Sequence, residues 1–315
     1  MGKPGKTDLR MDLKKKYYAK LMLAGEYGII VGSDAITVPY RSFFARLAKR
    51  EPKTPEKSII NSVASLRKLM IYIKSLPRNS FFATPDTDKL DQMLKEGYYI
   101  DSSIPQGYGI GSSGAVSALI YDQFFKSAQA ITLQQQKKDL ATLESCFHGK
   151  SSGVDAMTCY ANTPLHFLPG GDIRIIEKNP LQPPGDYRFF LMDSGQVFAT
   201  APLVSHFLDM MKDDDFQTTI RKDYFSLINK FIRAIDGSSG HDPALIFRAI
   251  SDLQWNHFRK MIPQNMEDAW INGQVSNAYY LKLNGSGGGY MLGIAAADST
   301  NVVEEMLPGQ KIIWL

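Results

Sequence analysis

A glycine-rich stretch at residues 104–125 constrains the fold and chemistry of this chain more than any other segment. Pro105 disfavours helix at the residue before it, so the preceding element ends there. Four glycines follow at close spacing: Gly107, Gly109, Gly111 and Gly114. They allow positive φ and a close approach of the backbone to a ligand. Apolar residues then recur at the spacing of one helix face, at Val116, Leu119, Ile120 and Phe124.

Ser112 and Ser113 suit a helix N-cap, so the stretch predicts a glycine-rich loop that leads into a helix N-terminus. Such a terminus presents unpaired N–H groups and the positive end of the helix dipole, which favour phosphate. The alternative is a flexible linker, or a turn that only caps a buried helix. The loop lacks the lysine of a Walker A sequence and the flanking strand and acidic partner of a dinucleotide fingerprint.

Composition narrows the class of protein. The length of 315 residues suffices for two domains with a sizeable core. A net charge of +4 is too small to indicate a nucleic-acid partner. The only two cysteines, Cys146 and Cys159, give no disulfide framework, so a reducing, cytoplasmic location is expected. No apolar run approaches the roughly 20 residues that span a bilayer, so no membrane partner is expected.

Helical and strand periodicities are interleaved along the chain without a clean βαβ repeat, which predicts an α+β fold. Strands are expected at 17–23, 28–31, 35–40, 165–168, 173–177, 187–193, 279–283 and 290–296. Helices are expected at 56–76, 132–147, 201–211, 216–235, 243–261 and 265–272, with another beginning at Val154. Residues 1–16 are polar and basic and predict a disordered tail. Prolines and a glycine at 180–185 predict a linker between domains at 17–184 and 185–315.

Four further clusters contain residues suited to chemistry. Strand alternation in Lys20–Glu26 places Lys20 on one face, where it is either functional or a solvated edge charge. Glu144 to Asp155 combines two carboxylates with serines and a glycine turn, a set suited to Mg²⁺-dependent phosphoryl transfer. Asp155 could equally be a helix N-cap.

The other two clusters are loops. Asp193–Thr200 follows a strand and offers hydroxyls at Ser194 and Thr200, although an ordinary strand-end turn is equally compatible with it. Residues 283–289 contain more glycine than a hairpin requires, which favours close backbone approach to a ligand or to another loop over a loose hairpin.

Taken together, three ordered motifs resemble those of the GHMP kinase family. They are Lys-x-x-Leu-x-Gly-Glu at Lys20, the glycine-serine loop after Pro105, and Gly-Ser-Gly-Gly-Gly at Gly285. The resemblance covers nearly the whole chain beyond the tail, and Glu144 through Asp155 is most similar to mevalonate kinases. It implies a two-domain α+β fold, with an N-terminal half like the second domain of ribosomal S5 and a ferredoxin-like C-terminal half.

The resemblance also implies roles for individual residues. Asp155 would be the catalytic carboxylate, with the Lys20 ammonium beside it. The ATP site would comprise Pro105, Gly107, Gly109, Ile110, Gly111, Ser112, Ser113 and Gly114. Ser113 and Glu144 would hold Mg²⁺. Substrate contacts would come from Glu26, Tyr27, Ser152, Thr200, Gly287 and Gly288. Homodimers are frequent in the family, so a homodimer is a further expectation.

The implied activity is ATP- and Mg²⁺-dependent phosphorylation of a small-molecule alcohol, with mevalonate converted to 5-phosphomevalonate in isoprenoid biosynthesis. Three departures affect the choice of substrate. Tyr27 stands where mevalonate kinases usually have His and phosphomevalonate kinases often have Tyr; Phe198 replaces an expected Arg, and Ser286 an Ala. Loss of the Arg removes a fixed carboxylate partner. Phosphomevalonate kinase and a sugar kinase are therefore alternatives. A non-catalytic nucleotide-binding relative is a separate alternative, against which the presence of Lys20, Glu144 and Asp155 together argues.

Overall fold

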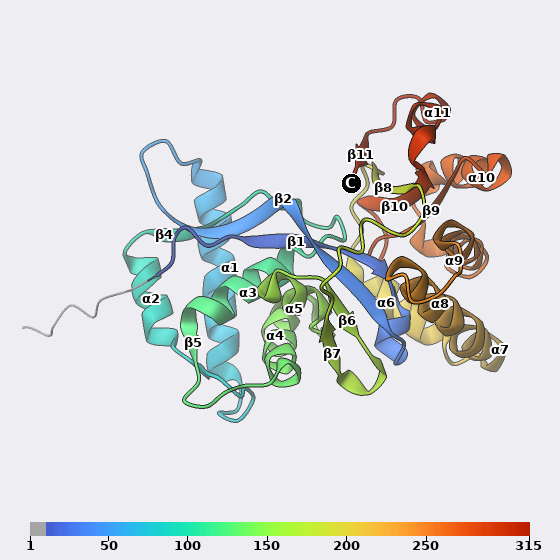
Figure 1. Cartoon of the computed structure of the whole chain (residues 1–315). Helices are drawn as coiled ribbons and strands as arrows, with labels where there is room; N and C mark the ends of the chain where they lie inside the picture. Colours follow the sequence, from blue (N-terminus) through green and yellow to red (C-terminus); the bar gives the residue numbers. More distant parts are fainter. Residues whose placement is uncertain (1–10) are drawn as a thin grey trace, which may run out of the picture. The chain divides into compact units, whose positions relative to one another are not determined.

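The computed structural model describes residues 11–315, apart from the side chain of His148 (Figure 1). The chain divides into two compact units, and each unit combines discontinuous segments. Unit 1 contains the residues up to Ala19, Arg41–Ile104 and Ser113–Tyr160. Unit 2 contains Lys20–Tyr40, Pro105–Ser112 and Ala161–Leu315. The expected domain boundary at 184/185 stays a prediction, and residues 1–10 of the expected tail lie outside the described part of the chain.

Unit 1 packs helices against a short piece of antiparallel sheet. The second half of β2 (Ala35–Lys49) pairs with β4 (Tyr98–Ser102), with Arg46 opposite Asp101. Helices α1 (Glu56–Ser75) and α2 (Thr87–Lys95) pack against β4 and against each other. The remaining elements are β3 (Thr84–Pro85), α3 (Ser112–Phe124), β5 (Phe125–Lys126), α4 (Leu133–His148) and α5 (Val154–Ala161). Their apolar faces, including Leu66, Leu69, Ile120, Leu140 and Leu143, are buried and form the core of this unit.

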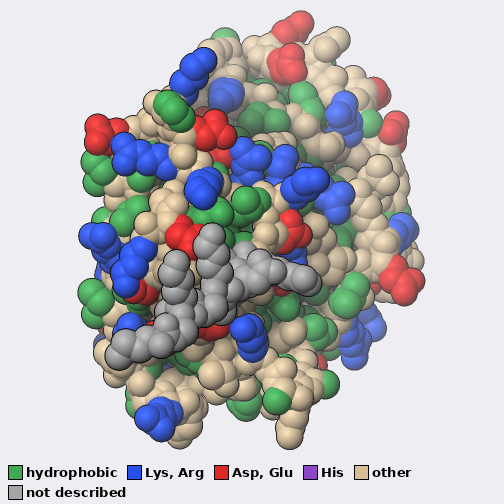
Figure 2. All heavy atoms as spheres, turned by 90° about the vertical axis from the view of Figure 1, so that its left-hand side faces the viewer, with side chains coloured by type: hydrophobic (Ala, Val, Ile, Leu, Met, Phe, Trp, Pro, Cys, Tyr) green, Lys and Arg blue, Asp and Glu red, His purple; other side chains and the backbone are tan. Residues whose placement is uncertain are grey.

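The face of the molecule that carries α2 and β4 is mixed in charge. Lysine and arginine side chains are spread over it with aspartate and glutamate among them (Figure 2). Residues 11–16, expected to be part of the tail, make contacts within unit 1. Lys15 Nζ lies 2.9 Å from Asp122 Oδ2, and the Lys16 ammonium lies 4.1 Å from the Phe44 ring centroid.

Unit 2 contains two pieces of antiparallel sheet. The first half of β2 pairs with β6 (Leu165–Phe167), which pairs with β7 (Ile173–Ile175), while β1 (Tyr17–Ala24) lies on the other edge of β2. A second sheet has the order β11-β8-β10-β9, from β8 (Tyr187–Asp193), β9 (Tyr279–Leu283), β10 (Tyr290–Ala296) and β11 (Ile312–Trp314). The predicted strands at 187–193, 279–283 and 290–296 are confirmed.

Helices of unit 2 cover the second sheet with aromatic side chains. Phe189 on β8 packs against Phe231 and Phe247, and all three are buried. The helices are α6 (Thr200–Met210), α7 (Asp214–Thr218), α8 (Phe225–Ile235), α9 (Pro243–His257), α10 (Glu267–Ser276) and α11 (Thr300–Met306). A π-helical turn, η3 (Thr219–Tyr224), interrupts the helix predicted at 216–235.

The strand predicted at 28–31 is wrong. These residues form a 3₁₀ turn, η1 (Gly28–Val31), in which Ile29 N donates to Gly25 O at 3.0 Å and Gly32 closes the turn in the left-handed region. A short apolar run does not distinguish a strand from a helical turn by periodicity. Glycines on both sides allow the tight turn, and a Cβ at Gly28 would lie 2.6 Å from Ser33 Oγ.

Candidate active site

The glycine loop of unit 2 ends where α3 begins at Ser112. Gly107, Gly109 and Gly111 have φ values of 75°, 70° and 78°, which confirms the left-handed conformations that glycine permits. The loop is followed by a helix of 13 residues, so the predicted arrangement of a glycine loop and a helix N-terminus is present. Its first N–H groups lack intrahelical partners by the geometry of any helix, which suits an anionic ligand.

The two glycine-rich loops of unit 2 pack backbone to backbone. A Cβ at Gly109 would lie 2.3 Å from the carbonyl oxygen of Asn284, and a Cβ at Gly289 would lie 2.2 Å from Tyr108 Cα. Since real Cβ atoms do not approach so closely, these positions exclude any side chain. The glycine excess at 285–289 is thus explained by contact with another loop, one of the two alternatives open from the sequence.

Segment 197–200 packs against both loops. A Cβ at Gly107 would lie 2.1 Å from Val197 Cγ1, and one at Gly288 would lie 2.9 Å from Phe198 N. Thr200 begins α6, and its hydroxyl lies 3.0 Å from Ser286 Oγ. A Cβ at Gly287 would lie 2.3 Å from the carbonyl oxygen of Met261, so this glycine also lies against backbone. Substrate contacts by Thr200, Gly287 and Gly288 stay predictions.

Strand β1 joins the two loops. Lys20 N donates to Ile110 O at 3.0 Å, and Met22 N donates to Asn284 Oδ1 at 3.1 Å. The Lys20 side chain is buried, with 1% of its surface exposed, so it is not a solvated edge charge. The first, second and third glycine-containing motifs therefore meet at β1 within one unit.

Tyr27 has an unusual backbone for an aromatic residue, with φ of 60°. Its ring packs against Phe207 and Phe258, and its hydroxyl donates to Ser286 O at 2.5 Å. Burial raises the pKa of Tyr27, and the charge of Glu26 raises it further, so the hydroxyl stays a donor. Tyr27, which was predicted to contact the substrate, therefore holds the 285–289 loop through this hydrogen bond.

Glu26 lies in a fully buried ion pair with Lys282 on β9, a residue that the sequence analysis did not identify. Neither side chain is exposed. A charged residue within an otherwise apolar strand was the available signal for Lys282. Contact of Glu26 with a substrate stays a prediction.

In unit 1, two hydroxyls converge on one carboxylate. Ser113 Oγ donates to Glu144 Oε1 at 3.0 Å, and Ser151 Oγ donates to Glu144 Oε2 at 2.6 Å. Ser113 lies in the first turn of α3, and Glu144 lies on α4 with 4% of its surface exposed. Ser151 was not predicted as a site residue; its place in the Ser-Ser-Gly turn after Gly149 was the available signal.

Asp155 lies in the first turn of α5, against the start of α3. A Cβ at Gly114 would lie 2.9 Å from both Asp155 C and Ala156 N, so the two helix starts are in backbone contact. Ser152 Oγ accepts from Val154 N at 3.4 Å. Gly153 N donates to Ser151 Oγ at 3.0 Å, which links the turn to the Ser151 hydroxyl beside Glu144.

This donor set fits a hard cation. Ser113, Ser151 and Glu144 supply oxygen atoms alone, which are the ligands Mg²⁺ prefers. Among residues 11–315, no group of three or more His, Cys, Asp or Glu is arranged to hold a metal ion. A cation here would thus be coordinated by one carboxylate and by hydroxyls of the protein. Phosphate oxygens of a bound ligand would complete its coordination, as in many Mg²⁺–phosphate sites.

The predicted residues form two clusters that are covalently joined between Ser112 and Ser113. The cluster of unit 2 contains Lys20, Glu26, Tyr27, Thr200 and the two glycine loops. The cluster of unit 1 contains Ser113, Gly114, Glu144, Ser152 and Asp155, and the structure adds Ser151 to it. The meeting of Lys20 with Asp155 stays a prediction.

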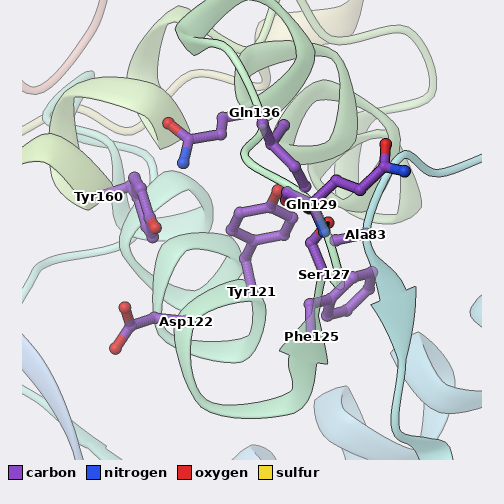
Figure 3. Close-up of a pocket in the computed structure, with 9 residues that line it drawn as sticks. Ala83, Tyr121, Asp122, Phe125, Ser127, Gln129, Gln136 and Tyr160 are labelled. Carbon is purple, nitrogen blue, oxygen red and sulfur yellow. Dashed lines mark hydrogen bonds between the residues drawn. The ribbon is translucent and has the colours of Figure 1, made fainter.

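A cavity of about 220 Å³ in unit 1 lies at the other end of α3 (Figure 3). Tyr121 and Asp122 from the end of that helix and Phe125 from β5 line it, with Gln136 and Tyr160. Since the expected phosphate site is at the helix start, this cavity is separate from it along α3. Its volume is below the approximately 300 Å³ of a typical small ligand pocket.

Comparisons with known proteins agree with this geometry. Residues 86–163 match the family model described as the GHMP kinases N terminal domain. No curated protein sequence matches the chain.

Solved structures of low sequence identity share the fold. L. major mevalonate kinase in complex with R-mevalonate is 18% identical with a TM-score of 0.64, over 98% of this chain and 94% of that one. Streptococcus pneumoniae phosphomevalonate kinase, in complex with phosphomevalonate and AMPPNP, is 14% identical with a TM-score of 0.62, over 96% and 99%. Lactococcus lactis galactokinase complexed with galactose is 12% identical with a TM-score of 0.64, over 98% and 95%.

The expected α+β GHMP kinase fold is confirmed, because the chain shares the fold of these solved structures over nearly its whole length. Within it, residues 86–163 match the N-terminal domain of the GHMP kinases. Identities of this size leave the substrate open.

Proposed function

We propose that the chain transfers the γ-phosphoryl group of ATP to the hydroxyl of a small-molecule alcohol, with mevalonate as acceptor and 5-phosphomevalonate as product. The observation that supports this most is the cluster in unit 1. It sets a buried carboxylate with two hydroxyls, at Glu144, Ser113 and Ser151, beside the start of a helix that follows a glycine loop. Phosphoryl transfer requires little covalent chemistry from a protein beyond positioning and charge stabilisation of this kind.

The glycine loop would bind the ATP phosphates through backbone N–H groups. Gly107, Gly109 and Gly111 orient the peptide units through left-handed conformations, and the start of α3 adds the positive end of its dipole. These groups would stabilise charge on the transferring phosphoryl group without reorganising during the reaction.

Ser113 and Glu144 would hold Mg²⁺. When bound, that ion would neutralise charge on the phosphate oxygens. The Ser151 hydroxyl would hold the second carboxylate oxygen of Glu144 in place.

Asp155 would accept the proton of the acceptor hydroxyl, or orient that hydroxyl toward the phosphorus atom. The Lys20 ammonium would lower the pKa of the hydroxyl and offset its developing negative charge. This proposal requires Lys20 and Asp155 to face one acceptor.

Tyr27 and Phe198 favour a second candidate, phosphorylation of phosphomevalonate or a sugar. A phosphorylated acceptor requires an additional basic group, which Lys150 or Arg174 would supply; both side chains are exposed in the structure. The neighbours in complex with phosphomevalonate and with galactose show that this fold accommodates either class of ligand in those proteins.

The substitution Asp155→Ala tests the proposed catalytic role of this carboxylate. We expect turnover to fall by a factor on the order of 10³ while ATP binding is retained, because general-base assistance contributes to the chemical step alone. Near-normal turnover in D155A would contradict the assigned role.

A cytoplasmic location, a homodimer and a place in isoprenoid biosynthesis belong to the same proposal. In the described part of the chain, the helices are too short or too polar to cross a bilayer.

A further inference from the structure

The cavity at the end of α3 has no part in the proposed mechanism. All the residues that line it belong to unit 1, and its volume is about 220 Å³. An apolar cavity of roughly 150 Å³ is large enough to take up benzene, so this one admits a molecule of similar size. It is too small for a nucleotide, because ligand pockets for larger molecules begin near 300 Å³. The cavity therefore suits a compact ligand.

The charge of the lining excludes anions. Among the described residues that line the cavity, Asp122 is the only charged side chain, and lysine, arginine and histidine are absent. An anion would lose its hydration here without gaining a cationic partner. ATP and phosphorylated acceptors are anions, so the cavity does not suit the ligands of the proposed reaction.

One wall of the cavity is aromatic and held in place. The Tyr121 ring centroid lies 5.2 Å from that of Phe125 and 5.4 Å from that of Tyr160. The Tyr121 hydroxyl donates to Asp139 Oδ2 at 3.1 Å, and Ala83 N donates to the same oxygen at 2.9 Å. Asp139 is buried, so this carboxylate fixes the wall from behind. Aromatic faces attract cations as well as apolar groups.

The Asp122 carboxylate has one oxygen open to a ligand. Its Oδ2 accepts from Tyr17 OH at 2.6 Å and from Lys15 Nζ at 2.9 Å. Among the described residues, none donates to Oδ1. Lys15 shares the negative charge of Asp122, but its own side chain is 42% exposed, so water screens the pair.

Two more acceptors lie beside Asp122. Figure 3 shows Asp122, Tyr160 and the side-chain amide of Gln136 to one side of the Tyr121 ring. Within residues 11–315, neither the Tyr160 hydroxyl nor the Gln136 amide has a hydrogen-bond partner. A hydroxyl, an amide oxygen and a carboxylate oxygen are thus available as acceptors in one cavity.

A primary ammonium group matches these features. It carries three N–H donors, and its positive charge is attracted both by a carboxylate and by aromatic faces. We propose that the cavity binds a small aliphatic primary amine. Its ammonium group lies toward Asp122, Gln136 and Tyr160, and its chain packs against Phe125 and Ile131. This site is independent of the proposed function, and it is testable without ATP or an acceptor.

The test uses three probes of one length that differ in charge: butylamine, 1-butanol and butyrate. Each is titrated at pH 7 into the full chain with ring-labelled tyrosine, and the dissociation constant is obtained by NMR. Butylamine should bind about tenfold or more tightly than 1-butanol, and butyrate should bind more weakly than both. Equal affinities for butylamine and 1-butanol, or no binding of butylamine, would overturn the proposal.

Asp122→Asn keeps the shape of the side chain and removes its charge. The preference for butylamine over 1-butanol should fall to within about twofold. Asp91→Asn is the matched control, because Asp91 pairs with Lys95 on α2 and does not line the cavity. An undiminished preference in D122N would place the amine elsewhere and overturn the proposal.

Lys15→Met provides a test that does not depend on the folding of D122N. It removes the cation that shares the Asp122 charge, so butylamine should bind more tightly than in the wild type, while the affinity for 1-butanol stays within about twofold. Weaker binding of butylamine in K15M would contradict the role of Asp122.

Tyr160→Phe and Tyr160→Leu separate the hydroxyl from the ring. The phenylalanine keeps an aromatic face and should weaken butylamine binding less than the leucine does. Tyr160→Leu should also weaken butylamine more than 1-butanol, because only the cation gains from the face of the ring. Affinities for both probes that are unchanged in Y160L would overturn the assignment to this cavity.

Discussion

Ser113 and Glu144 are joined by a hydrogen bond of 3.0 Å between the first turn of α3 and the interior face of α4. The bond brings a hydroxyl at a helix N-terminus onto a nearly buried carboxylate. Because both groups bind hard cations, this contact is the basis for expecting Mg²⁺ dependence.

Glu144→Gln should raise the Mg²⁺ concentration required for half-maximal activity by about tenfold or more. The amide keeps the shape of the side chain and one oxygen, but it removes the charge that a cation requires. The measurement is ADP release against Mg²⁺ concentration at saturating ATP. An unchanged Mg²⁺ requirement would exclude Glu144 as a ligand.

Ser151→Ala is the matched variant in that experiment. It keeps the Glu144 charge and removes only the 2.6 Å bond to Oε2, so its Mg²⁺ requirement should change less than that of E144Q. An effect larger than that of E144Q would show that Ser151 itself is the more important group.

Gly109→Ala should destabilise the protein far more than Gly97→Ala. Both glycines have positive φ, 70° and 82°, so the backbone strain of about 1–2 kcal/mol that an alanine would meet is shared. At Gly109 a Cβ would also lie 2.3 Å from Asn284 O, whereas at Gly97 no described atom lies within 4 Å. We expect the two free energies of unfolding, measured with denaturant, to differ by about 2 kcal/mol or more. Equal values would mean that the loops are not in contact in solution.

Tyr27→Phe should lower the free energy of unfolding by about 1 kcal/mol and raise the KM for the acceptor. The substitution removes the bond to Ser286 O but keeps the ring among Phe207 and Phe258. Tyr280→Phe, which removes a 3.2 Å bond to nearby Asn277, is the control. If both variants change KM alike, the Tyr27 hydroxyl has no special role at the 285–289 loop.

Asp86→Asn tests the electrostatics of α2, where the Asp86 side chain caps the helix by accepting from Lys89 N at 2.9 Å. Partial burial favours the neutral acid, but the bond from Lys89 N and the bond and charge of Lys126 outweigh it and lower the pKa of Asp86. A lowered pKa in the folded state means that the charge stabilises the protein above the ordinary Asp pKa of about 3.9. That stabilisation is lost as the pH falls through the lowered value.

Asn caps helices as well as Asp, so D86N removes the charge and keeps the cap. We expect D86N to be less stable than the wild type by about 0.5 kcal/mol at pH 7, with the difference vanishing in acid. Denaturant unfolding at several pH values measures this. A difference that persists unchanged in acid would assign the effect to geometry rather than charge.

The glycine loop, the helix after it and most strands were predictable because their signals are local. Gly107 and Gly109 require left-handed backbone, and the apolar period after Ser113 fixes one helix face. The prediction of a strand at 28–31 was wrong because the segment is too short. Four apolar or glycine residues show no period that would distinguish a strand from a helical turn.

The partners of individual side chains were not predictable from the sequence. Lys282 lies 256 residues from Glu26, and only the folded sheet brings the two together. Ser151 and Ser152 are adjacent serines of similar local character, yet only Ser151 reaches Glu144. Resemblance to a family supplied roles for Asp155 and Glu144, but it contained no information about these supporting contacts.

The most direct test of the central claim is ADP release by the purified protein with ATP and Mg²⁺ and a panel of mevalonate, phosphomevalonate, galactose and other sugars. We predict release that depends on mevalonate and is lost in D155A. Release with phosphomevalonate or a sugar alone would retain the kinase and change its substrate. A folded protein that releases no acceptor-dependent ADP with any of them would contradict the account.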